Sequence, residues 1–292
     1  MRRWRLEGIA GTVALLALLA ACGGGSGAGS STQARPPAPP LPATLVGHGP
    51  RQVGDTTIDR LLRLGLPIYC GGHRGHLLAL TFDDGPGVYT SLVIRKLTRA
   101  GERVTFFDVG RSIDHYPGYL RRELRIAAIG DHTYTHPALI ALPRSQITWQ
   151  LKATAHKIEA QSGRHVELFR PPYGLHNAAV DRIAKRLGLL QILWNVDSQD
   201  SLGANYAQII MHVEAGLHTG AIILMHENRG QTIRALTTLL PVLHRRHLRS
   251  VSVPALLAAD PPSSAQVRRG AKGCGATPAR INRRPRGRRA GA

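Results

Sequence analysis

The sequence L-L-A-L-T-F-D-D-G-P, residues 77–86, decides the fold. Its apolar run is long enough for one buried strand, and two carboxylates, Asp83 and Asp84, end it before the turn signal Gly85-Pro86. Successive strand residues point to opposite faces, so both carboxylates reach one site only if the chain bends, and we expect Gly85-Pro86 to supply that bend. Taken alone, the stretch favours a simpler interpretation, in which one aspartate caps the next helix and its neighbour is solvated.

Strands and helices alternate along the chain around this stretch. The sequence predicts strands at residues 77–86, 103–109, 189–197, 221–227 and 250–253, a strand end at residues 131–137, and within residues 166–174 a short strand that leads Arg170 into a Pro-Pro turn. It predicts helices at residues 56–66, 90–100, 117–129, 145–162, 177–187, 206–217 and 232–246. The order of strand then helix is typical of a mainly parallel sheet, and about seven strands predict a closed or nearly closed β/α barrel. With 43% hydrophobic residues, a chain of 292 residues can build the necessary core.

Polar residues able to do chemistry lie at the carboxyl ends of the predicted strands. In a barrel these ends form one mouth, where catalytic groups are usually found. The seven residues are Asp83, Asp84, His132, Arg170, Asp197, Asp200 and His226. Packing alone does not explain so many such residues on one rim.

Two histidines, His132 and His136, are four residues apart in D-H-T-Y-T-H-P, residues 131–137. On a helix this spacing would bring both imidazoles to one metal ion. The intervening residues and the proline favour a strand end that runs into a short turn instead. The zinc-protease motif H-E-x-x-H would need glutamate where Thr133 stands, which argues against a protease.

Five motifs together resemble those of a known family. T-F-D-D-G-P, H-T-Y-T-H, R-P-P-Y-G, D-S-Q-D and L-M-H-E, in this order, are similar to the motifs of NodB-like polysaccharide deacetylases, carbohydrate esterase family 4. The resemblance covers residues 77–257 and implies a single catalytic domain, an α/β fold with a distorted (β/α)7 barrel. It also implies a divalent metal, usually Zn²⁺, bound by Asp84, His132 and His136.

The resemblance implies a role for each remaining motif residue. Asp83 would be the general base, oriented by Arg170, and His226 the general acid, supported by Asp200. The backbone N–H of Tyr173 would help to hold the oxyanion. Two further positions of the motifs, Asp197 and Leu224, would lie in the substrate groove.

The resemblance also implies a function, with alternatives left open. The first hypothesis is metal-dependent removal of N-acetyl groups from cell-surface polysaccharide that contains N-acetylglucosamine, with peptidoglycan as the main candidate. A deacetylase of chitin oligomers or acetylxylan is an alternative. A non-catalytic wall-binding lipoprotein is another, although a pure binder needs neither Asp83 nor His226.

Four departures from the family pattern bear on substrate preference. Residues 126–127 are Ile-Ala where the family often has Gly-His, and Ser201 stands where tryptophan commonly forms a wall of the sugar groove. Glu227 replaces a frequent aspartate, and Asp108 is an acid where a strand residue is usually apolar. None of the four removes a metal ligand or catalytic group, so we expect activity.

The amino terminus predicts export. Three arginines precede an uncharged segment at residues 8–21, which is too short to span a bilayer and is typical of a secretory signal. Small residues before Cys22 resemble the lipobox of bacterial lipoproteins, so we expect residues 1–22 to be a lipoprotein signal with lipid on Cys22. The protein would then be anchored to the outer face of the cytoplasmic membrane. An ordinary secretory signal with an incidental cysteine is the alternative.

Composition predicts the remaining divisions of the chain. Residues 23–43 are rich in Gly and Ser and then in Pro and predict a linker, residues 44–260 the catalytic domain, and residues 261–292 a basic disordered tail. The tail carries Lys272 and eight arginines and no acid, within a chain of net charge +20. It has no aromatic residue for base stacking, so anionic wall polymers or lipid headgroups are better partners than nucleic acid. A tail without a function is the alternative.

Three cysteines complete the inventory. If Cys22 carries lipid, Cys70 and Cys274 are left as a pair in an oxidising compartment, and we expect a disulfide between them. We expect the protein to be a monomer.

Overall fold

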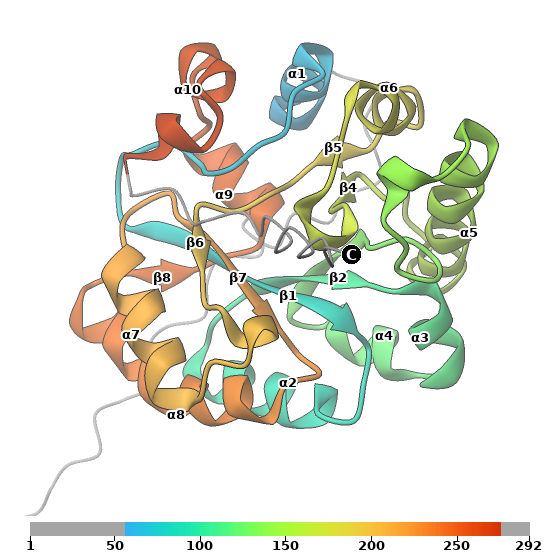
Figure 1. Ribbon diagram of the computed structural model, residues 1–292. Helices are drawn as coiled ribbons and strands as arrows, with labels where there is room; N and C mark the ends of the chain where they lie inside the picture. The colour runs from blue at the N-terminus through green and yellow to red at the C-terminus, as the bar shows by residue number, and fades with distance from the viewer. Residues whose placement is uncertain (1–55, 276–292) are drawn as a thin grey trace, which may run out of the picture. The chain divides into compact units, whose positions relative to one another are not determined.

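A parallel sheet forms the centre of the computed structural model, which describes residues 56–275. The strands are β1 (Leu77–Gly85), β2 (Val104–Asp108), β3 (Ala127–Asp131), β4 (Leu168–Phe169), β5 (Leu190–Gln191), β6 (Val196–Asp197), β7 (Ile222–His226) and β8 (Arg249–Ser250). Their order is β5-β4-β3-β2-β1-β7-β6, and β8 pairs with the start of β1. Every strand pairing is parallel. The sheet curls like a barrel (Figure 1). The barrel is open because no pairing among these strands joins β5 to β6.

Helices surround the sheet and connect its strands (Figure 1). They are α1 (Thr57–Leu64), α2 (Thr90–Ala100), α3 (Gly110–His115), α4 (Tyr119–Glu123), α5 (Arg144–Ser162), α6 (Ala178–Arg186), α7 (Tyr206–Gly216), α8 (Gly230–Arg245), α9 (Val253–Ala259) and α10 (Ser264–Arg268), with 3₁₀ turns η2 (Leu139–Ala141), η3 (Pro172–Gly174), η4 (Asp200–Leu202) and η5 (Gly270–Cys274). In the described part of the chain no helix is both long and apolar enough to cross a bilayer.

Strand β1 lies in the middle of the sheet and divides the core. Leu78, Leu80 and Phe82 pack with residues of α2 and α8 on one side, whereas Ala79 belongs to a second apolar cluster. Side chains alternate along a strand, so Asp83 points to the same side as Ala79, toward the inside of the curl. The strand therefore carries its carboxylate into the barrel mouth.

Two predicted elements differ in the structure. Residues 117–129 were expected to form one helix, but α4 ends at Glu123 and β3 begins at Ala127. A short buried apolar run has the same sequence pattern in a strand and in a helix, which explains the error. Residues 189–197, predicted as one strand, form the separate strands β5 and β6. Between them Asn195 accepts a hydrogen bond from the Ile222 N–H through Oδ1, at 2.8 Å, so a side chain replaces part of the strand ladder.

The carboxyl-terminal boundary also needs correction. The basic tail was expected to begin at residue 261, but α10 and η5 are ordered helical turns within it. Cys274 forms a disulfide with Cys70, with their Cα atoms 5.8 Å apart. The folded part therefore extends past residue 260. The predicted signal, Cys22, the linker at 23–43 and residues 276–292 lie outside the described residues.

Candidate active site

Both carboxylates of the T-F-D-D-G-P motif reach the barrel mouth because β1 is irregular at Asp84. This residue has φ 70°, and the pairing with β2 shifts register between Asp83 and Gly85. A non-glycine residue at positive φ is uncommon and turns its side chain away from the regular alternation. The bend that we expected at Gly85-Pro86 thus begins at Asp84 itself.

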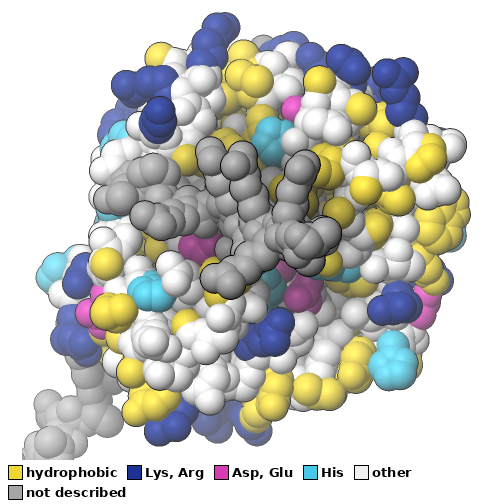
Figure 2. Space-filling model, in the orientation of Figure 1, with side chains coloured by type: hydrophobic (Ala, Val, Ile, Leu, Met, Phe, Trp, Pro, Cys, Tyr) yellow, Lys and Arg dark blue, Asp and Glu magenta, His cyan; other side chains and the backbone are white. Residues whose placement is uncertain are grey.

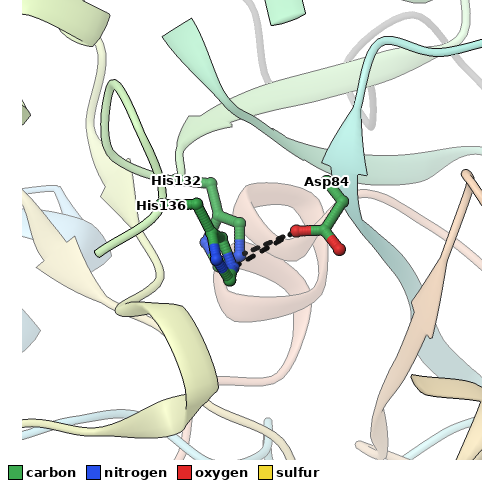
Figure 3. Close-up of side chains that lie close together, drawn as sticks. All are labelled: Asp84, His132 and His136. Carbon is green, nitrogen blue, oxygen red and sulfur yellow. Dashed lines mark ion pairs between the residues drawn. The ribbon is translucent and has the colours of Figure 1, made fainter. Parts of the chain in front are cut away.

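Asp84, His132 and His136 form a compact cluster (Figure 3). Asp84 Oδ1 lies 3.7 Å from His132 Nε2 and 3.3 Å from His136 Nε2. The two histidines follow β3 in a tight turn, in which Thr133 and His136 have positive φ. Gln150 of α5 fixes this turn, because its Oε1 accepts hydrogen bonds from the backbone N–H groups of residues 134 and 135.

The chemistry of these donors fits a divalent metal. His132 Nδ1 is 2.7 Å from the Arg170 carbonyl oxygen, so Nδ1 carries the proton and Nε2 is free to bind. Burial lowers the pKa of His136 to about 4, which keeps its imidazole neutral as a ligand must be. The three donor atoms lie within 4.8 Å of one another. Three nitrogen and oxygen donors that leave a position open are typical of a catalytic zinc site.

A buried ion pair holds Asp83. Arg170 Nη1 donates to Asp83 Oδ1 at 2.7 Å, and it also donates to the Thr81 hydroxyl at 2.8 Å. The guanidinium is fully buried and stacks 4.1 Å from the centre of the Phe107 ring. The other carboxylate oxygen, Asp83 Oδ2, is 3.7 Å from His132 Nε2. Asp83 therefore lies beside the metal ligands with its charge compensated by arginine.

A second buried pair lies on the opposite side of β1. His226 Nδ1 is 2.7 Å from Asp200 Oδ1, and Asp200 Oδ2 accepts from the His226 N–H at 2.7 Å and from the Thr232 hydroxyl at 2.5 Å. Burial acts to lower the pKa of His226, but the hydrogen bond and charge of Asp200 outweigh it and raise the pKa to about 9. The same contacts lower the pKa of Asp200 despite its burial. The pair is charged at neutral pH, with the proton on the histidine.

Comparison with known proteins identifies the family of this chain. The family model "polysaccharide deacetylase" matches residues 71–192. The peptidoglycan-N-acetylglucosamine deacetylase PgdA of Listeria monocytogenes is 34% identical over 181 residues, which are 61% of this chain and 38% of PgdA. A chitooligosaccharide deacetylase of a Bradyrhizobium species is 30% identical over 197 residues, which are 61% of this chain and 89% of that enzyme. The chain belongs to the polysaccharide deacetylase family.

Solved structures of family members share the fold. A family 4 carbohydrate esterase from Streptomyces lividans has a TM-score of 0.57 and 32% identity, covering 62% of this chain and 92% of the esterase. A family 4 pseudoenzyme from Bacillus anthracis has a TM-score of 0.62 and 29% identity, covering 65% of this chain and 68% of the pseudoenzyme. Since family members include a pseudoenzyme, family membership alone does not establish catalysis, and the residues of the site must decide.

The three residues predicted for the oxyanion site and groove occupy different environments in the structure. Tyr173 has φ 62° and is 57% exposed, and its ring lies 4.8 Å from that of His136, so it stands at the mouth beside the metal ligands. Leu224 is buried in β7, paired with Asp197 of β6. Asp197 Oδ1 accepts from the Gln199 N–H at 2.8 Å. Asp197 also lines a cavity of about 650 Å³, whose other walls include residues 215–219 and Cys274 and none of the proposed metal ligands.

Sequence reasoning missed three residues that support the site. Thr232 and Gln150 fix the second pair and the histidine turn, and Asn228 Nδ2 donates to Asp84 Oδ2 at 3.2 Å. Thr232 and Gln150 lie in α8 and α5, outside the five motifs, where no sequence pattern marks them. Asn228 directly follows L-M-H-E, so its proximity to the last motif was the only available signal.

Proposed function

We propose that this protein removes N-acetyl groups from polysaccharide that contains N-acetylglucosamine, with a divalent metal, Zn²⁺ by preference, at Asp84, His132 and His136. One observation carries the proposal: the Asp83–Arg170 and Asp200–His226 pairs flank the candidate metal ligands. A protein that only binds glycan gains nothing from two buried ion pairs at this place. Amide hydrolysis, in contrast, needs one group that accepts a proton and one that donates it.

The chain's own residues have distinct parts in this reaction. A metal bound at the cluster would supply Lewis acidity toward water and the amide oxygen. Asp83, held in place by Arg170, accepts the proton of the attacking water. His226, kept protonated by Asp200, donates a proton to the nitrogen as the C–N bond breaks. The backbone N–H of Tyr173 is proposed to donate to the developing oxyanion.

The substrate class rests on the leaving group and on the relatives. An amine is a poor leaving group until it is protonated, and the raised pKa of His226, to about 9, fits that task. Relatives are named as deacetylases of peptidoglycan N-acetylglucosamine and of chitooligosaccharides, and another as a bifunctional xylanase/xylan deacetylase from Cellvibrio japonicus. We take peptidoglycan as the first substrate to test, and chitin oligomers and acetylxylan as the alternatives.

We further propose that the protein is exported, anchored by lipid on Cys22 and able to bind anionic wall polymers. The Cys70–Cys274 disulfide supports an oxidising compartment. The net charge of +20 supports an anionic partner, and Figure 2 shows lysine and arginine side chains around the edge of one face. Cys22→Ser should release the protein from the membrane fraction of expressing cells. Persistence of the variant in that fraction would contradict the lipid anchor.

The decisive experiment measures acetate release by the purified full-length chain. The substrates are peptidoglycan, N-acetylglucosamine oligomers and acetylxylan, each with the protein chelator-treated and then supplemented with zinc. We expect release that disappears with the chelator and returns with zinc. A protein that binds these glycans yet releases no acetate from any of them would establish the binding-module alternative, as its likeness to a pseudoenzyme allows.

A further inference from the structure

Three carboxylates outside the active site meet beneath the end of β1. Asp108 ends β2, Glu123 ends α4, and Glu227 follows β7. One oxygen from each lies within 4.8 Å of the others. We call these three residues the acidic cluster. It lies against Gly85, where an added Cβ would be 1.4 Å from Glu227 Oε1 and 3.1 Å from Asp108 Oδ1, so only glycine fits there.

The acidic cluster is fully buried and almost without partners. All three residues have 0% exposure. Among the described residues, no hydrogen-bond donor reaches Asp108 Oδ1 and Oδ2, Glu123 Oε1 and Oε2, or Glu227 Oε1. The sixth oxygen, Glu227 Oε2, accepts from the Thr90 hydroxyl at 3.0 Å. Five of the six oxygens therefore receive no hydrogen bond from any described residue outside the acidic cluster.

Other buried acids of this protein show how unusual that is. Glu102 is equally buried, but its oxygens lie 2.7 Å from His244 Nε2, 3.2 Å from Arg249 Nε and 2.6 Å from the Ser250 N–H. Asp200 is paired with His226. Buried carboxylates without such partners are costly, and proteins hold them by pairing them, by protonating them or by binding a metal.

Protonation is the competing explanation for the acidic cluster. Burial raises the pKa of Asp108 to about 7, and it raises the pKa of Glu123 and of Glu227 well above their ordinary values. The carboxyl groups of Asp108 and Glu123 are close enough to share a proton. Each shared proton would serve two oxygens, one as the donor and one as the acceptor, so proton sharing also lowers the cost of burying these acids. A cation satisfies charge and oxygens together.

We propose that the acidic cluster binds one Ca²⁺ ion, at a site separate from Asp84, His132 and His136. All the donors are oxygens, which favours a hard cation over zinc. Ca²⁺ lies about 2.3–2.6 Å from its ligands and accepts bidentate carboxylates. Ligand atoms of one Ca²⁺ ion are then at most roughly 5.2 Å apart, and one oxygen from each acid lies within 4.8 Å of the others. Mg²⁺ usually retains several waters, for which a fully buried pocket of side chains is poorly suited.

The position of the site indicates what the ion would do. Gly85 touches the acidic cluster and follows Asp84, the proposed ligand of the catalytic metal. An ion bound there would hold β2, α4 and the segment after β7 to the end of β1. It would stabilise the fold beneath the active site without contacting substrate. This inference does not depend on the proposed deacetylase activity.

The test uses the purified full-length chain, freed of metal and then given CaCl₂ alone or ZnCl₂ alone. At about 100 times the dissociation constant, Ca²⁺ should raise Tm by about 5–10 °C in a domain of this size. Glu123→Gln should lose the calcium shift and keep the zinc shift. His132→Ala should lose the zinc shift and keep the calcium shift. Glu102→Gln, a matched change in a buried acid that has partners, should keep both shifts.

Stoichiometry gives a second measurement that does not require a variant of the cluster to fold. Equilibrium dialysis of His132→Ala with radioactive calcium should give one ion per chain. The proposal is overturned if this variant binds no calcium at about 10 mM, above the range of weak extracellular calcium modules. It is also overturned if Glu123→Gln and Asp108→Asn, both folded, retain the calcium shift. Stability that rises on acidification with no response to calcium would establish proton sharing instead.

Discussion

The acids of the active-site mouth and those of the acidic cluster are buried in opposite ways. Asp83 and Asp200 each face a specific cation, Arg170 and His226, at 2.7 Å. In the acidic cluster five oxygens have no donor among the described residues. Both regions lie at the end of β1, so position in the fold does not explain the difference. Partners supplied by the chain fix the protonation state of a carboxylate, whereas their absence leaves that state to protons or to a bound ion.

The largest effect should come from removing a ligand of the proposed catalytic metal. Asp84→Ala or His132→Ala takes away one of three protein donors, so metal occupancy and acetate release should both fall to background. Metal analysis and the acetate assay measure the two outcomes. Glu214→Gln, a change in a partly exposed acid of α7 paired with Arg246, is the control. Full metal content in both alanine variants would show that the site has been assigned wrongly.

Loss of the base should have the next largest effect. Asp83→Asn keeps the size of the side chain and an oxygen for Arg170, but it cannot accept the water's proton, so the rate should fall about 10²- to 10⁴-fold. Metal content and glycan affinity should change little, since Asp84, His132 and His136 remain. A wild-type rate in this variant would place the base elsewhere.

The Asp200–His226 pair makes a prediction about pH. In metal-free protein, NMR titration of His226 should give a pKa near 9, above its ordinary value of about 6.5. The stabilisation that the Asp200–His226 pair gives the fold is then fully present below about pH 6.5 and is lost as the pH rises through about 9. Asp200→Asn leaves burial as the main influence, so the pKa should fall below its ordinary value. A pKa of His226 that does not move in this variant would show that Asp200 is not its partner.

Much of this architecture follows from sequence, because strands such as β1 and β7 combine an apolar run with a polar residue at their carboxyl ends. The family resemblance then assigned Asp83, Arg170 and His226, which the structure brings together. Periodicity failed at β3, where a short apolar run follows a helical turn. It also failed at residue 195, where an asparagine side chain interrupts a strand that the apolar pattern continues.

The acidic cluster shows a different limit. The sequence marks Asp108 and Glu227 as departures from the family pattern, but nothing places them together. Glu123 lies in a segment that was predicted to be one helix, in which an acid is ordinary. Three residues on separate elements become a site only when the fold brings them together, and neither spacing nor composition records such a contact.

The smallest effect should be on fold stability, when a buried glutamate is replaced by glutamine. The same substitution is made at Glu102, which has partners, and at Glu123 of the acidic cluster. Glu102→Gln removes a charge that faces His244 and Arg249 and should destabilise the fold by about 1–3 kcal/mol. This loss is smaller than for a fully buried pair because both partners are partly exposed.

Glu123→Gln in calcium-free buffer should instead stabilise the fold. Asp108 and Glu227 face it and Arg122 is nearby, and burial raises its folded pKa, so wild-type stability falls as pH rises above the ordinary glutamate pKa. The variant escapes that loss, and chemical denaturation should show a gain of about 1 kcal/mol at pH 8 that disappears at pH 5. If Glu123→Gln destabilises as much as Glu102→Gln at both pH values, Glu123 has a partner within the chain and the contrast between the two regions fails.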